Sequence, residues 1–261
     1  MAETSLTLSL AGDVATVRLT RPEAHNALDE TMVGTLAQAF QKLSVAEAVR
    51  VVVLEAEGDS FCAGGDVGRM RHAADLPPDD NRRDAMQLAV MLDAVERCAK
   101  PVVALVHGAA LGGGIGLVAA CDVAIAADQA SFGLTEVRLG LIPAVIGPYV
   151  AAAIGVRACR RYVLTGERFD AREALRLGLV HAVVAADRLG EARDRMVEAL
   201  RKGGPKAQSD AKELLRVLAA TPPGPDLMRW TTARLAEIRS GDEAREGLAA
   251  FLEKRKPGWT G

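Results

Sequence analysis

Apolar positions follow two different spacings along this chain. At residues 6–10 and 14–19, on either side of Ala-Gly-Asp, apolar residues alternate with polar or small ones, which predicts a β-hairpin. After Asp29, apolar side chains recur at helical spacing, which predicts a helix capped by that aspartate. Apolar runs at residues 49–56 and 102–106 predict buried strands. The chain therefore begins as strand, strand, helix, and this unit then recurs.

The middle of the chain continues this rhythm. Apolar spacing predicts a helix at 85–98, a helix at 113–120 after the strand at 102–106, and a short strand at 123–126. Further helices are predicted at 146–154 (ended by Gly155), 157–165, 171–177 and 187–202, with a last strand at 180–184. The polar stretch 72–83, which contains Asp-Leu-Pro-Pro-Asp-Asp, is interpreted as a mobile loop near the site.

The Gly-Gly-Pro sequence at 203–205 marks a boundary. Beyond it, residues 206–219, 226–238 and 242–254 have helical spacing and no strand pattern. We predict a catalytic α/β core at 1–202 and a helical region at 203–261 that packs against neighbouring subunits.

Composition narrows the class of protein. The 261 residues are 49% hydrophobic, enough for one large core, and 32 basic against 34 acidic residues leave the chain nearly neutral. Near neutrality and 3% aromatic residues argue against a nucleic-acid or anionic-membrane partner. No basic leader is visible, and no apolar run reaches the ~18 residues of a membrane span, so a cytoplasmic location is expected.

Cysteines and histidines do not indicate a metal site. The four cysteines are far apart with no Cys-x-x-Cys pair, and the four histidines lack His-Glu-x-x-His spacing. Cys62 could be considered as a nucleophile, but a small buried residue at a strand end is the simpler interpretation. We expect no metal.

Glycine clusters follow two of the predicted strands, and they carry the main chemical signal. Gly112–Gly114 follow the strand at 102–106 and begin a helix, and Gly64 and Gly65 follow the strand at 51–57. Glycines let a substrate approach the backbone closely, and the free N–H groups of a helix start favour negative charge. Two such amides could form an oxyanion hole. A P-loop or dinucleotide site does not fit the register, whereas glycines used only for close packing remain the alternative.

The order of motifs resembles the crotonase, or enoyl-CoA hydratase/isomerase, family over nearly the whole chain. The segments that carry the resemblance are Arg21-Pro-Glu-Ala-His-Asn-Ala-Leu-Asp29, Phe61-Cys-Ala-Gly-Gly-Asp66, His107-Gly-Ala-Ala-Leu-Gly-Gly-Gly114, Cys121-Asp122, Phe132-Gly-x-x-Glu136, Leu139-Gly-Leu-Ile-Pro143, Leu164-Thr-Gly166 and Glu246 to Arg255. The resemblance implies a spiral of repeated β-β-α units with a helical C-terminal region.

The resemblance also assigns site residues. It implies that the amides of Gly65 and Gly113 hold the thioester oxygen of an acyl-CoA and stabilise an enolate. Ala63 would line the adenine pocket, the coenzyme would run along His25, and Lys254 would reach its phosphates, although a solvated surface charge is an equal reading of that lysine. A further residue, Asp66, is expected to contact the bound substrate. Coenzyme A is then part of the substrate, so no separate cofactor is implied.

The family's hydratases commonly use two glutamates, and this chain has one of them. Glu136 matches the second position, whereas Gly116 stands at the first. Glu136 could deprotonate water and return a proton to the α-carbon, or it could move a proton between the α- and γ-carbons as an isomerase does. A distant alternative is a catalytically silent protein that binds CoA or RNA.

A further resemblance links the segments 136–146 and 160–170 to bacterial 3-methylglutaconyl-CoA and isohexenylglutaconyl-CoA hydratases. It favours hydration of a branched substrate, and our hypothesis is that Gly116 makes room for the branch. The substrate carboxylate would need a cation from among Arg69, Arg71 and Arg83. The resemblance further implies a homotrimer or a hexamer of paired trimers.

Overall fold

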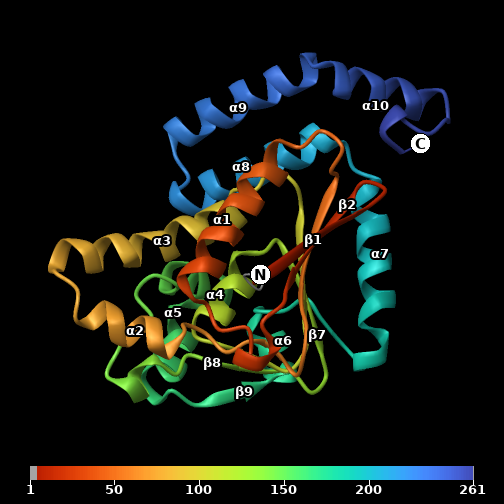
Figure 1. Cartoon of the computed structure of the whole chain (residues 1–261). Coiled ribbons are helices and arrows are strands. Elements are labelled where there is room, and N and C mark those ends of the chain that lie inside the picture. The colour runs from red at the N-terminus through yellow and green to blue at the C-terminus, as the bar shows by residue number, and fades with distance from the viewer. Residues whose placement is uncertain (1–4, 261) are drawn as a thin grey trace.

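The computed structural model describes residues 5–260, in which helices surround the strands of two sheets (Figure 1). The larger sheet has the order β1-β2-β3-β5-β7-β10, with β1 and β2 antiparallel and the later neighbours parallel. Its strands are β1 (Leu6–Ala11), β2 (Val14–Leu19), β3 (Val51–Ala56), β5 (Val102–Val106), β7 (Val123–Ala127) and β10 (Ala182–Val184). The hairpin and the buried strands predicted from the sequence are confirmed.

The smaller sheet has the order β4-β6-β8-β9, in which β4, β6 and β8 are parallel and β9 is antiparallel. Its strands are β4 (Ser60–Cys62), β6 (Ala109–Leu111), β8 (Ser131–Gly133) and β9 (Arg168–Asp170). Three successive pairs, β3-β4, β5-β6 and β7-β8, each add one strand to the large sheet and the next to the small sheet before a helix follows. This is the spiral of β-β-α units that the sequence predicts.

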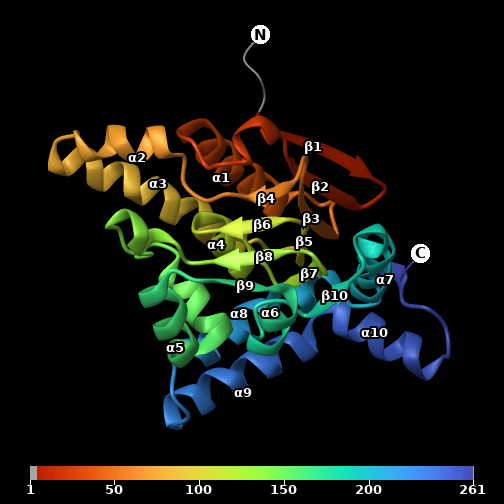
Figure 2. The same cartoon turned by 90° about the horizontal axis from the view of Figure 1, so that it is seen from below.

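Helices cover both sheets and form the C-terminal region (Figure 2). They are α1 (Glu30–Val45), α2 (Val67–Ala74), α3 (Pro78–Glu96), α4 (Gly113–Ala120), α5 (Gly147–Thr165), α6 (Ala171–Leu177), α7 (Leu189–Arg201), α8 (Pro205–Ala220), α9 (Pro225–Ser240) and α10 (Asp242–Leu252). Asp29 caps α1 by accepting a 2.7 Å hydrogen bond from the Met32 amide, as its position in the sequence predicts.

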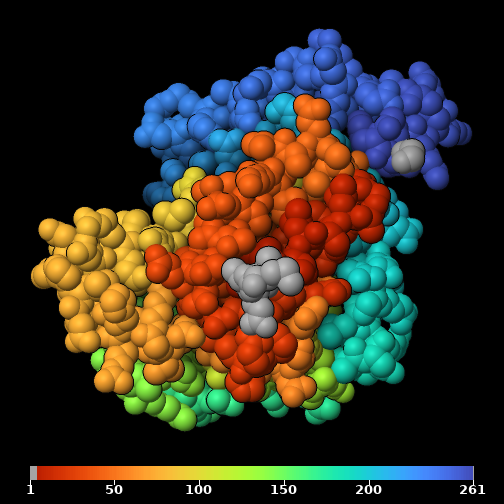
Figure 3. Space-filling model, in the orientation of Figure 1, coloured from red at the N-terminus to blue at the C-terminus, as the bar shows by residue number. Residues whose placement is uncertain are grey.

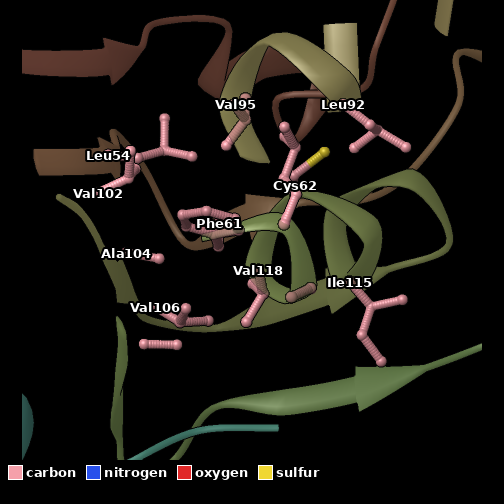
Figure 4. Close-up of a cluster of buried hydrophobic side chains, with 14 of the residues drawn as sticks. Leu54, Phe61, Cys62, Leu92, Val95, Val102, Ala104, Val106, Ile115 and Val118 are labelled. Atoms are coloured by element: carbon pink, nitrogen blue, oxygen red, sulfur yellow. The ribbon is translucent and has the colours of Figure 1, made fainter. Parts of the chain in front are cut away.

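The main core lies between the two sheets and the helices α1, α3 and α4. Phe61 and Cys62 of β4 pack against Leu92 of α3 and Ile115 of α4 in this core (Figure 4). The apolar α4 is buried on nearly all of its surface, so its glycines lie inside the protein rather than on a flexible loop. A smaller core joins the other face of the large sheet to α7.

The C-terminal helices form an arm along one edge of the molecule, shown in blue in Figure 3. Lys212 of α8 donates to the Lys100 carbonyl and to Asp122, and Arg50 donates to the carbonyls of Gly203 and Trp259. These hydrogen bonds hold the C-terminal helices against the β-β-α core. The division of the chain at residue 203 into two functional regions stays a prediction.

Residues 72–83 do not form the mobile loop that the sequence suggested. They complete α2 and begin α3, with only a short turn between these helices. Pro78 stands in the first turn of α3, where a missing N–H costs nothing, and Asp79 and Asp80 complement the helix dipole there. The Pro-Pro-Asp-Asp sequence is therefore a helix start rather than a loop.

Gly155 separates two helical segments, as predicted. Its φ of 76° and ψ of 150° are not helical, so α5 consists of two helices joined by a kink at this residue. Within residues 5–260, no helix is long and apolar enough to cross a bilayer.

Candidate active site

A cavity of about 490 Å³ opens at the carboxyl ends of β4, β6 and β8. Residues 63–66 follow β4, Gly112 and Gly113 follow β6, and Glu136 comes just after β8. Parallel strands that end at one edge of a sheet deliver their following residues to the same place, so three distant segments meet here. The helices α2 and α3 and the segment 139–146 complete the walls of the cavity.

The two glycine turns touch each other in this cavity. A Cβ added at Gly64 would lie 3.5 Å from the Gly113 nitrogen and 2.9 Å from the Leu111 carbonyl oxygen. A Cβ at Gly113 would lie 3.8 Å from the carbonyl carbon of Gly64, the atom bonded to the Gly65 nitrogen. The peptide units that carry the Gly65 and Gly113 amides are therefore neighbours, and glycine at position 64, with φ at 99°, lets them approach.

Both of these amides are available to a ligand. Gly113 is the first residue of α4, where helix geometry leaves the N–H without an intrahelical acceptor. The two hydrogen bonds between Leu28 and the first glycine turn involve the neighbours of Gly65. The Leu28 amide donates to the Gly64 carbonyl, and the Asp66 amide donates to the Leu28 carbonyl. Among the residues that the structure describes, neither the Gly65 nor the Gly113 N–H donates a hydrogen bond to another backbone group. An oxygen with developing negative charge fits such a pair of donors.

The segment 21–29 holds the first glycine turn in position. The buried Asn26 donates from its side-chain amide to the carbonyls of Glu57 and Ser60, on either side of the β3–β4 connection. Leu28 donates its amide to the Gly64 carbonyl at 2.7 Å, and the Ala63 amide donates to the His25 carbonyl at 2.9 Å. Residues 25–28 of the Arg21–Asp29 motif therefore stabilise the turn that carries Gly65.

Glu136 lies against the second glycine turn. A Cβ added at Gly112, whose φ is 47°, would lie 3.1 Å from the Glu136 Oε1 atom. The Oε2 atom is buried and has no hydrogen-bond partner within residues 5–260. Burial raises the pKa of the Glu136 carboxyl above its ordinary value of 4.5, against a smaller lowering by its own backbone amide. A half-buried carboxyl with a raised pKa and a free oxygen is suited to accept and return a proton.

This raised pKa predicts a stability change with pH. The folded state binds the Glu136 proton more tightly than the unfolded state does. The free energy of unfolding therefore decreases as pH rises from 4.5, the unfolded value, through the higher pKa of the folded state. We expect Glu136→Gln to melt at a higher temperature than the wild type at neutral pH, with the difference shrinking below pH 4.5. Thermal melts of both proteins across this range test it, and a constant difference at every pH would contradict it.

The other two carboxylates of the cavity wall are occupied. Asp66 caps α2 by accepting from the Arg69 amide at 3.1 Å, and Asp84 accepts from the Arg69 guanidinium at 2.8 and 2.9 Å. Among the described cavity residues, Glu136 is thus the carboxylate with a buried oxygen that has no hydrogen-bond partner. The pairing of Arg69 with Asp84 has no signal in the sequence, because the two residues lie on separate helices, α2 and α3, which come together only in the fold.

Of the three arginines considered for a substrate carboxylate, only Arg69 lines the cavity. Its side chain is 13% exposed. Arg83 is 75% exposed and pairs with Asp80 on the surface of α3, and the exposed Arg71 is not part of the cavity wall.

Gly116 does not make room for substrate, and our steric hypothesis was wrong. A Cβ at this position would lie 2.6 Å from Cγ2 and 2.9 Å from Cβ of Ile146, so the space is already filled by that side chain. Ile146 lines the cavity and Gly116 does not. Ile146 was not predicted as a site residue, because in the sequence it cannot be told from the many apolar residues of the core.

Of the remaining residues with a predicted binding role, Ala63 lies in the cavity wall, whereas His25 and Lys254 do not. Ala63 lines the cavity, whereas His25 lies behind the same turn, with its Nδ1 3.4 Å from Ser60 Oγ. Lys254 follows α10, which Figures 1 and 2 show on the opposite side of the chain from α2. A single chain therefore does not bring Lys254 to the cavity.

Neither a reactive thiol nor a cluster of metal-ligand side chains lies in the described part of the cavity. Burial raises the pKa of Cys62 to about 12, so this thiol stays protonated at neutral pH and packs in the core. The described residues contain no group of three or more His, Cys, Asp or Glu side chains that could hold a metal ion.

Comparisons with known proteins agree with this geometry. A sequence model of the enoyl-CoA hydratase/isomerase family matches residues 10–261. The crystal structure of an enoyl-CoA hydratase from Shewanella pealeana is 42% identical, with a TM-score of 0.95 over 98% of this chain and 96% of that one. Pseudomonas aeruginosa AtuE is 39% identical, with a TM-score of 0.94 over 98% and 100%. The (E)-benzylidenesuccinyl-CoA hydratase of Thauera aromatica is 31% identical over 258 residues, 98% of this chain and 99% of that protein.

Proposed function

The chain belongs to the enoyl-CoA hydratase/isomerase family, and from this premise we propose that it adds water across the α,β double bond of an enoyl-CoA thioester. The observation that carries the proposal is the meeting of two free backbone amides with one unpartnered carboxylate oxygen in a single cavity. Relatives named as hydratases support the same reaction.

In the proposed reaction, the N–H groups of Gly65 and Gly113 donate to the thioester oxygen. Glu136 takes a proton from water as the water oxygen forms a bond to the β-carbon, and the π electrons move onto the thioester oxygen to give an enolate. The two amides stabilise this enolate more than the ground state, because charge on the oxygen has increased. Glu136 then gives its proton to the α-carbon, so the water is fully incorporated and the carboxylate is regenerated.

A double-bond isomerase is the second candidate, because one free carboxylate is the minimum that this chemistry needs. Glu136 would then remove a proton from one carbon of the acyl chain and return it to another, with no water consumed. The same two amides would stabilise the enolate. The two candidates differ in whether the conjugated double bond is lost by hydration or moved.

We further propose that the acyl group carries a branch and a free carboxylate, as in 3-methylglutaconyl-CoA. Among the described residues of the cavity wall, Arg69 is the cation, and a 31% identical relative is named for (E)-benzylidenesuccinyl-CoA, a substituted succinyl thioester. The hydrogen bonds from Arg69 to Asp84 fix the Arg69 guanidinium and leave other N–H groups of the guanidinium for a substrate carboxylate.

Replacing Arg69 with glutamine tests this substrate class. We expect kcat/KM for 3-methylglutaconyl-CoA to fall by about 10- to 100-fold, the effect of losing one charged hydrogen bond of about 1.5 to 3 kcal/mol. Crotonyl-CoA, which has no second carboxylate, is expected to lose much less. The control is Arg83→Gln on the surface of α3, and an equal loss with both substrates would contradict the assignment.

Assembly is proposed on different grounds. The arm formed by α8–α10 exposes large apolar side chains, including Phe251 at 81% and Leu252 at 79%. Patches of this kind usually mark a protein interface, which supports a homotrimer or a hexamer of paired trimers. Lys254 lies beside these residues, so its proposed contact with the coenzyme's phosphates would come from a neighbouring copy.

A cytoplasmic location also remains a prediction.

The overall proposal is tested by incubating the enzyme with crotonyl-CoA and 3-methylglutaconyl-CoA. Hydration removes the ultraviolet absorbance of the conjugated enoyl thioester and increases the product mass by one water. Loss of absorbance without a mass increase would indicate isomerisation. No reaction with either thioester would leave the silent, CoA-binding alternative.

A further inference from the structure

The backbone of α4 and the start of α5 are in direct contact through Gly116 and Ile146. A Cβ added at residue 116 would lie 2.9 Å from Cβ and 2.6 Å from Cγ2 of Ile146, which is closer than van der Waals contact allows. The next nearest atom to that position, Cδ1 of Leu92, is at an ordinary contact distance of 3.7 Å. Ile146 alone therefore excludes a side chain at position 116.

Ile146 cannot easily move out of this contact. It is 2% exposed, and its carbonyl accepts the Val150 amide at 3.1 Å as the first turn of α5 forms. The following amide, of Gly147, donates to the Pro143 carbonyl at 2.8 Å. Rotation about χ1 would move Cγ2 but leave Cβ in place, so any side chain at position 116 requires the backbone of one helix to shift.

Ile146 also faces the substrate space. It belongs to the wall of the cavity that contains Gly113 and Glu136. The side chain thus has one surface against Gly116 and another toward the cavity, and it forms an apolar boundary between α4 and any bound acyl group.

We propose that Ile146 is the specificity-determining residue of the acyl pocket and that Gly116 is the positioning residue that allows it to sit there. The pair forms an apolar wall, which limits the size of the acyl group and leaves Glu136 to transfer protons without a partner from α4. This inference rests on the proposed function for the identity of the ligand, but the contact itself does not.

The contact is tested by a double-mutant cycle on the full-length protein, with Gly116→Ala and Ile146→Gly measured by urea unfolding. Alanine normally stabilises a helix interior relative to glycine. We expect Gly116→Ala to lower the unfolding midpoint in the wild-type background and to be neutral or stabilising in the Ile146→Gly background. The matched control is Val150→Gly in α5, which is buried, does not line the cavity and is expected to give no rescue.

The specificity is tested with the same Ile146→Gly variant and two probes, crotonyl-CoA and 2-octenoyl-CoA. We expect the ratio of kcat/KM for the longer thioester to that for crotonyl-CoA to rise by at least about 10-fold, as pocket enlargements typically give. The Val150→Gly control is expected to leave this ratio unchanged.

Three results would overturn the inference in distinguishable ways. An equal effect of Gly116→Ala in both backgrounds would refute the positioning role. An unchanged substrate ratio in Ile146→Gly would refute the specificity role. If the wild type hydrates or isomerises neither thioester, the proposed function fails and the specificity claim fails with it, whereas the unfolding cycle still decides the contact.

Discussion

The Glu136→Gln variant is expected to turn over enoyl-CoA thioesters about 10²- to 10⁴-fold more slowly than the wild type, because a positioned acid–base group contributes a factor of this size. Glutamine keeps the shape of the side chain and removes its basicity. The effect should lie near the upper end of the range, since no second free carboxylate lines the cavity among the described residues.

Initial rates with crotonyl-CoA, followed by loss of the enoyl-thioester absorbance, measure this effect. The matched control is Glu47→Gln, an exposed glutamate in the connection before β3, which should keep wild-type rates. Far-ultraviolet circular dichroism confirms that both variants are folded. Turnover of Glu136→Gln within a few-fold of the wild type would show that the proton transfers take place elsewhere.

Replacing Gly113 with proline is expected to lower kcat/KM by about 10²- to 10³-fold, the cost of removing one oxyanion donor. Position 113 is the first residue of α4, where a proline fits the helix and deletes only an N–H that has no intrahelical acceptor. This is one of the few places where a backbone donor can be removed by substitution.

The control for this experiment is Gly113→Ala, which keeps the N–H and introduces the same Cβ. That Cβ would lie 2.7 Å from Cδ1 of Leu28, so both variants share any cost of moving the leucine side chain. The difference between proline and alanine therefore measures the loss of the N–H together with the ring carbons that take the place of its hydrogen. Equal activities in the two variants would refute a role for the Gly113 N–H.

Much of the fold could be predicted because local signals and long-range packing agree. The cap at Asp29, the hairpin at residues 6–19 and the glycine start of α4 are each encoded by neighbouring residues. The segment 72–83 misled because its proline and aspartates suit both a loop and a helix start, and the packing of α2 and α3 beside the cavity decides between them.

The site was predictable to a smaller extent. The structure brings Gly65, Gly113 and Glu136 into one cavity, and each had been singled out from a motif. The function of Gly116 could not be deduced in the same way, because an absent side chain is informative only when its neighbour is known. That neighbour, Ile146, comes from a separate helix, and the sequence holds no local sign of the contact.

The central claim is that one carboxylate and two backbone amides add water to an enoyl thioester. Its most direct test is nuclear magnetic resonance of crotonyl-CoA, labelled with ¹³C at the β-carbon, incubated with the enzyme in D₂O. We predict that the labelled carbon changes from an alkene to an alcohol carbon and that one deuterium enters the α-carbon, with both changes strongly slowed in Glu136→Gln. A labelled carbon that stays an alkene, or an alcohol formed equally fast by Glu136→Gln, would contradict the account.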